Sequence, residues 1–137
     1  MSLDEKLKLP VIEVYFDGGF NPTLRCYGSW EVVGSGVDRK ELKFRFDGVR
    51  VESSNSAEYL SLLNALVWLQ QVKEKKAKRL MIYTDSTLVQ HQVTGRHKTH
   101  QQHLKEFCAM VRNNLSKWGF WSIHWRSRVE NVARFGH

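Results

Sequence analysis

Three acidic residues, Asp17, Glu58 and Asp85, are placed where carboxylates can act together on one ligand. Taken singly, each has an ordinary structural explanation: a turn before glycine for Asp17, a helix capping box with Asn55 for Glu58, and a helix cap for Asp85. Three carboxylates held close together repel one another and require a compensating cation. Oxygen ligands suit Mg²⁺ or Mn²⁺, so the joint placement predicts a divalent metal site.

The segments around these acids alternate between strand and helix patterns. Three short runs indicate antiparallel strands joined by turns, and the first run closes on Asp17-Gly18-Gly19, a turn sequence. Apolar residues then recur at helical spacing and indicate a crossover helix. The predicted strands cover 11–16, 27–33, 41–46, 80–84 and 120–126; the predicted helices begin after 53–56, at 85–87 and near 104, and end near 72, 95 and 118.

This element order, βββαβααβ, predicts an α/β fold with a five-stranded mixed sheet flanked by helices. The crossover makes the strand before Asp85 parallel and adjacent to the strand that carries Asp17. Both side chains should then emerge at the carboxyl edge of the sheet, where open α/β sheets place their ligands. Glu58, in the first turn of the crossover helix, should lean over the same edge.

Three short strings carry a resemblance to a known family. They resemble the first three acidic motifs of type 1 ribonuclease H, in the same order and on the same elements: Tyr15-Phe16-Asp17-Gly18-Gly19, Asn55-Ser56-Ala57-Glu58-Tyr59 and Tyr83-Thr84-Asp85-Ser86. The resemblance runs from about Val11 to Asn131. It implies the ribonuclease H-like fold and endonucleolytic hydrolysis of the RNA strand of RNA–DNA hybrids.

The resemblance also implies a two-metal mechanism. One ion would activate a water and the other would stabilise the leaving 3′ oxygen. Asp17 would bridge the two ions, with Glu58 and Asp85 each holding one side. By the same resemblance, Asn55 would contact the minor groove of the hybrid, where the 2′-hydroxyls lie. The cofactor expected is therefore Mg²⁺ or Mn²⁺.

Contacts with nucleic acid are expected around this site. Asn21 takes a position that contacts phosphate in the family, although Phe20-Asn21-Pro22-Thr23-Leu24 replaces the usual Gly-Asn-Pro-Gly loop. The basic protrusion of the family's longer members is too short here, so the grip would depend on scattered Lys and Arg. The expected nucleic-acid-binding residues are Gly18, Asn21, Asn55, Ser86, Lys98, Arg126, Arg128 and Asn131.

The sequence departs from the family at the fourth acidic motif, an asparagine followed four residues later by an aspartate. The run from Arg128 to Asn131 fits the start of this motif, but the aspartate position is Phe135 without a gap, or Arg134 with a one-residue deletion. The loss of a negative charge weakens a second metal site. Replacements considered are Glu130, the terminal carboxylate, and the imidazole of His124 or His137; spacing selects none of them.

The length and composition of the chain limit the number of domains, the cellular setting and the kinds of partner that we expect. The chain has 137 residues, a formal charge of +7 and only two cysteines, Cys26 and Cys108, far apart. These features predict one domain over 1–137 with a disordered leader at 1–9, a reduced cytoplasmic setting, a monomer, no membrane partner, and attraction to a polyanion such as nucleic acid. No apolar run reaches the roughly 18 residues that cross a bilayer.

Three functions stay open at this point. The first is a metal-dependent ribonuclease H, the second a catalytically weakened relative that binds nucleic acid, and the third a resolvase-like or transposase-like nuclease of the same superfamily. A zinc site among His91, His97, His100 and His103 is disfavoured, because no cysteine or acid completes a tetrahedral set.

Overall fold

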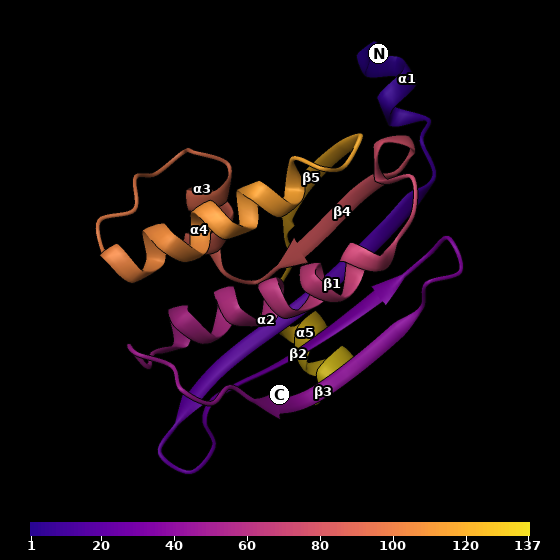
Figure 1. Ribbon diagram of the computed structural model, residues 1–137. Helices are drawn as coiled ribbons and strands as arrows, with labels where there is room; N and C mark the ends of the chain where they lie inside the picture. The colour runs from indigo at the N-terminus through magenta and orange to yellow at the C-terminus, as the bar shows by residue number, and fades with distance from the viewer.

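A computed structural model describes all residues 1–137 as a five-stranded sheet with helices on both of its faces (Figure 1). The strands are β1 (Val11–Asn21), β2 (Arg25–Val33), β3 (Arg39–Arg45), β4 (Arg79–Thr84) and β5 (Phe120–Trp125). The helices are α1 (Leu3–Leu7), α2 (Ser54–Trp68), α3 (Thr87–Val93), α4 (Gln102–Leu115) and α5 (Arg128–Phe135), with 3₁₀ turns at Leu69–Gln71 and Lys75–Ala77. No helix is long and apolar enough to cross a membrane.

The sheet has the strand order β3-β2-β1-β4-β5, with β1 at its centre. β1 pairs antiparallel with β2, and β2 antiparallel with β3. β4 lies parallel to β1 on the other side, and β5 lies parallel to β4. The mixed five-stranded sheet predicted from the element order is therefore confirmed, with α2 as part of the crossover that returns the chain to the centre of the sheet.

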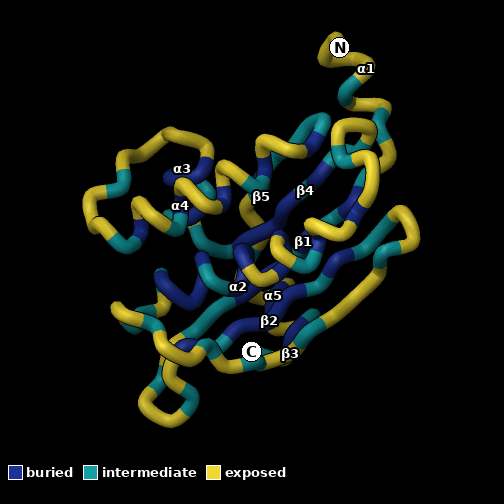
Figure 2. The backbone as a smooth tube through the Cα atoms, viewed as in Figure 1, coloured by how far each residue is buried: buried dark blue, intermediate teal, exposed yellow.

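The hydrophobic core lies between the sheet and the helices α2 and α4. Strand alternation points Ile12, Val14 and Phe16 toward α2, and all three are fully buried. Figure 2 shows this burial as a dark band along β1, β4 and the inner side of α2. α5 lies against the opposite face of the sheet, behind it in Figure 1. The sheet is thus covered on both faces near the carboxyl end of β4.

The first turn of α2 lies directly on β1 at Gly18. A Cβ built on Gly18 would be 2.4 Å from the carbonyl carbon of Ala57 and 2.5 Å from the backbone nitrogen of Glu58. Such distances leave no room for any side chain. Glycine at this position therefore lets the backbone of α2 approach β1 closely enough for Glu58 to reach Asp17.

The end of the first strand differs from the sequence prediction. Asp17-Gly18-Gly19 was expected to be a turn, but β1 continues to Asn21, and Asp17 pairs with Ser29 of β2 inside the strand. The prediction was wrong because the glycines serve close packing rather than a reversal: Gly18 faces Ala57, and a Cβ on Gly19 would be 2.5 Å from the hydroxyl of Tyr27. The hairpin turn falls beyond Asn21.

Both ends of the chain form helices that the sequence prediction omitted. The expected leader at 1–9 contains α1, where Ser2 and Glu5 form a capping box and no residue is buried. α5 buries Asn131 and Phe135 on one side. It ends at Gly136, whose φ of 78° is the left-handed cap that glycine favours. This cap redirects the chain at His137.

Candidate metal centre and nucleic-acid interface

Three carboxylates from three separate elements meet at one edge of the sheet. Asp17 comes from β1, Glu58 is the fifth residue of α2 rather than part of its first turn, and Asp85 is the residue that follows β4. One oxygen of each lies within 4.8 Å of the others. The pairing of β1 with β4 ends at Tyr15 and Tyr83, so the two aspartates each follow the last pair by two residues. No other group of three or more histidine, cysteine or acidic residues in the chain is arranged in this way.

Neither Glu58 nor Asp85 caps a helix in the structure, and Asp17 lies inside β1 rather than in a turn. The cap of α3 is Ser86, whose Oγ accepts a hydrogen bond from the Val89 N–H at 3.1 Å. The cap of α2 is Ser53, whose Oγ accepts from the Ser56 N–H. Glu58 therefore belongs to no capping box, and its Oε2 is buried without any hydrogen-bond partner. Leaving a buried polar oxygen unpaired is costly, so the arrangement calls for a ligand.

The protonation of these groups reflects the same uncompensated charge. Burial, and then the charge of Asp85, raise the pKa of Asp17 to about 7. Burial, and then the charges of Asp17 and Asp85, raise the pKa of Glu58 well above its usual range. The positive charge of Arg128 opposes both shifts only in part. The set fits a hard divalent cation, which would pair the free oxygen of Glu58 and offset the repulsion.

An imidazole occupies the side of the cluster next to Asp17. Nδ1 of His137 lies 3.1 Å from Oδ2 of Asp17, and Nε2 of the same ring lies 2.6 Å from Oγ of Ser29. Its ring also packs edge-on against Tyr27. Burial, and the nearby charges of Lys43 and Arg128, lower the pKa of His137 below its ordinary value. The neutral ring is therefore the form favoured in the folded protein.

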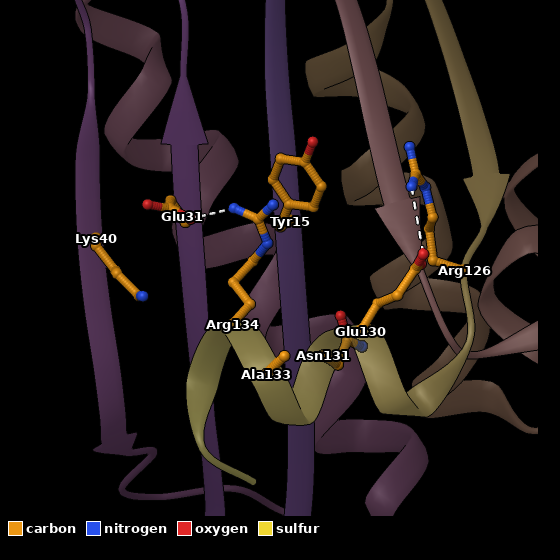
Figure 3. Close-up of a pocket in the computed structure, with 8 residues that line it drawn as sticks. All are labelled: Tyr15, Glu31, Lys40, Arg126, Glu130, Asn131, Ala133 and Arg134. Carbon is orange, nitrogen blue, oxygen red and sulfur yellow. Dashed lines mark hydrogen bonds and ion pairs between the residues drawn. The ribbon is translucent and has the colours of Figure 1, made fainter.

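Neither position aligned with the family's fourth acid contributes to the cluster. Phe135, the last residue of α5, is buried, with 4% of its surface exposed. Arg134 reaches over the ring of Tyr15, 3.5 Å from its centroid, and forms an ion pair with Glu31. Figure 3 shows this arrangement, with Arg134 extended from α5 across β1 toward β2. The guanidinium of Arg134 thus contacts Tyr15 and Glu31 rather than the three carboxylates.

The other expected binding residues divide by location. Arg128, at the start of α5, is exposed and close enough for its charge to act on all of the buried site groups described above. Asn131 is buried, and its Nδ2 has no partner. Asn55 lies half-buried at the second position of α2, beside the site. Lys98 is exposed in the loop between α3 and α4.

Two expected contacts already have local roles. Oδ1 of Asn21 accepts hydrogen bonds from the N–H groups of Thr23 and Leu24, at 3.0 and 2.6 Å, and so shapes the hairpin turn. Ser86 is the cap of α3, and Gly18 is covered by the backbone of α2. These residues position the site; direct contact of any of them with nucleic acid remains a prediction.

Arg126 and Glu130 line a cavity of about 440 Å³ between α5 and the sheet (Figure 3). Arg126 stacks over Tyr83, 4.5 Å from the ring centroid, and lies 3.6 Å from Glu130. His124, on β5, hydrogen-bonds Ser122 and pairs with no carboxylate. Glu130 and His124, considered as replacements for the missing acid, are therefore engaged elsewhere.

Comparisons with known proteins agree with this architecture. Ribonuclease H1 from the archaeon Halobacterium salinarum superposes with a TM-score of 0.71 at 23% identity, covering 88% of this chain and 89% of that one. The N-terminal ribonuclease H domain of a Mycobacterium tuberculosis protein gives 0.73 at 18% identity, with 89% and 91% covered. LC11 ribonuclease H1, solved in complex with an RNA/DNA hybrid, gives 0.70 at 21% identity, with 89% of each chain covered.

The chain thus shares its fold with these ribonuclease H structures, as the sequence motifs predicted. A model of the family described as reverse transcriptase-like matches residues 43–134, about two thirds of the chain. The chain belongs to that family. A search of curated proteins returns no match.

Two features of the site were not identifiable from the sequence. Ser29 lies in a strand with no motif around it, and His137 reaches the site only because α5 forms and Gly136 reverses the chain. The available signal was weak: a Phe-Gly-His string after an amphipathic segment that begins at Arg128. Sequence reasoning named His137 as one of several replacements without a reason to select it.

Proposed function

We propose that this chain is a nuclease of the ribonuclease H type that hydrolyses the RNA strand of RNA–DNA hybrids in the presence of Mg²⁺ or Mn²⁺. The observation that carries the proposal is the convergence of Asp17, Glu58 and Asp85, with a buried oxygen of Glu58 left unpaired. Family membership and the fold support a nuclease. The hybrid as substrate is supported by the sequence motifs and by the bound hybrid in one structural relative.

We propose that these three carboxylates bind divalent cations, and that two cations are bound during turnover. A cation bound there supplies a water of lowered pKa and positive charge against the leaving oxygen. Asp17 and Glu58, whose pKa values are raised in the folded protein, must lose their protons for this binding. Metal affinity should therefore rise as the pH increases through about 7, the pKa of Asp17.

The chain's own residues supply orientation and grip. Arg128 is exposed and places positive charge near the carboxylates, where it could attract a phosphate backbone. Trp125 is about half exposed and fixed by a hydrogen bond from its indole N–H to the carbonyl of Asp85 at 3.2 Å. Its exposed ring is available for contact with a sugar or base next to the site. Lys98 would add a more distant phosphate contact.

The test is cleavage of a labelled RNA–DNA hybrid by purified protein with Mg²⁺ or Mn²⁺, compared with duplex DNA, branched DNA and single-stranded RNA. Wild type should cleave the hybrid, and Asp17→Asn should lower the rate by about 10³-fold or more, since a metal ligand is worth several kcal/mol in the transition state. Absence of hybrid cleavage in both metals would refute the proposal. Preference for branched DNA would favour a resolvase-like activity instead.

A second function is favoured by one specific observation. No carboxylate occupies the family's fourth acidic position, because Phe135 is buried and Arg134 pairs with Glu31. A protein weakened in this way would bind nucleic acid without efficient turnover. It would show hybrid binding that falls steeply with salt, together with little or no cleavage at saturating Mn²⁺.

A further inference from the structure

We infer that His137, which follows α5, is a positioning residue of the metal centre that holds the carboxylate of Asp17. This inference deepens the proposed function and rests on it. The geometry points to a chain of three polar contacts that begins in the backbone of β3 and ends on Asp17. The first two contacts are hydrogen bonds, and the third brings Nδ1 of His137 to 3.1 Å from Oδ2 of Asp17.

The first link is the backbone N–H of Lys43, which donates to Oγ of Ser29 at 2.8 Å. This contact depends on an irregularity in β3. Gly28 pairs with Phe44 and Trp30 with Glu41, so two residues of β3 stand opposite Ser29, as in a β-bulge. Lys43 has a φ of 45°, in the left-handed region that a residue with a side chain rarely adopts. The strained bulge releases this N–H from the sheet ladder and delivers it to Ser29.

The second link joins Ser29 to the imidazole. A serine hydroxyl has one proton and two acceptor sites. The Lys43 N–H uses one acceptor site, and the hydroxyl can donate its proton to an unprotonated Nε2 of His137, 2.6 Å away. Ser29 is fully buried, so water does not compete for these contacts.

The third link reaches the metal centre. In the tautomer that accepts from Ser29 through Nε2, the ring proton lies on Nδ1, which is 3.1 Å from Oδ2 of Asp17. This contact orients the Asp17 carboxylate and leaves Oδ1 free to bind a cation. A hydrogen-bonded ligand is better oriented and binds metal more tightly, and loss of such a partner lowers metal affinity about 10- to 100-fold.

The arrangement distinguishes His137 from a simple substitute for the missing acid. A neutral imidazole adds no negative charge, and the nitrogen facing Asp17 carries a proton, so it holds a ligand rather than acting as one. His137 should therefore orient Asp17 as a fourth acidic residue would, without adding the negative charge of that residue. An asparagine at position 137 would keep a donor near the place of Nδ1, whereas an alanine would keep none.

The experiment measures Mn²⁺ binding by calorimetry for wild type, His137→Ala and His137→Asn, with His124→Ala as the matched loss of an imidazole that pairs with no carboxylate. We expect His137→Ala to weaken binding about 10-fold or more. His137→Asn and His124→Ala should stay within about threefold of wild type, roughly 0.6 kcal/mol. Circular dichroism and thermal melting in EDTA establish that each variant is folded.

Several results would overturn the inference. One is an unchanged Mn²⁺ affinity in folded His137→Ala, and another is equal weakening in His137→Asn and His137→Ala. A crystal structure with Mn²⁺ in which a nitrogen of His137 coordinates the ion would replace the positioning role with direct ligation. If wild type binds Mn²⁺ and the variants behave as expected but no hybrid is cleaved, the proposed function fails while the positioning role stands. If wild type binds no Mn²⁺, both fail.

Discussion

Replacing Asp17 by asparagine should stabilise the metal-free protein at alkaline pH, although it removes a metal ligand. The folded protein holds the pKa of Asp17 at about 7, against an ordinary value of 3.8, chiefly through burial and the charge of Asp85. A raised carboxyl pKa means that the native state binds more protons than the unfolded chain, so stability falls as the pH rises. The loss begins above about pH 4 and is complete above about pH 7.

The size of the effect follows from the shift. About three pKa units at about 1.36 kcal/mol each give roughly 4 kcal/mol at pH 8, and relaxation of the site would reduce this to about 2–4 kcal/mol. Asparagine avoids this cost because it carries no charge, and its carbonyl oxygen can still face Nδ1 of His137. Removing the Asp17 charge also eases the ionisation of Glu58, which acts in the same direction.

The assay is urea unfolding of wild type and Asp17→Asn in EDTA at pH 4 and pH 8, with Asp47→Asn as an exposed control. Asp17→Asn should be the more stable protein at pH 8, and the difference should vanish near pH 4. Mn²⁺ should then reverse the order, since 100 times the Kd stabilises wild type by about 2.7 kcal/mol. Equal stability of the two proteins at pH 8 in EDTA would refute the account of a strained, uncompensated carboxylate cluster.

Three further outcomes test other parts of the structure. Gly18→Ala should lower stability by about 1–3 kcal/mol or more and weaken Mn²⁺ binding, because its Cβ would meet the backbone of Ala57 at 2.4 Å; unchanged urea midpoint and affinity would contradict the close approach. Arg134→Ala should leave the Mn²⁺ affinity within about twofold of wild type while lowering the melting temperature, since Arg134 serves Tyr15 and Glu31; tighter metal binding would instead place it at the site. Lys98→Ala should weaken hybrid binding similarly for all sequences and reduce the slope of log K against log salt by about 1; an unchanged slope would remove Lys98 from the interface.

The sequence by itself determined the sheet, the crossover and the three acids. Period-two and helical patterns located the strands and α2, and the parallel crossover requires that Asp17 and Asp85 share an edge. These inferences succeed because they depend on local periodicity and on the handedness and order of elements. Only the structure excludes a capping role for Glu58 and Asp85, because Ser53 and Ser86 cap the two helices.

Only the tertiary structure decided what surrounds the acids. The turn chemistry of Asp17-Gly18-Gly19 and its close packing against α2 look alike in sequence, because glycine serves both purposes. His137 lies more than a hundred residues from Ser29 along the chain, and it reaches Asp17 through a helix, a left-handed glycine and a bulge in a distant strand. No local spacing encodes such a contact. The long-range packing of α5 on the sheet determines which residue stands beside Asp17.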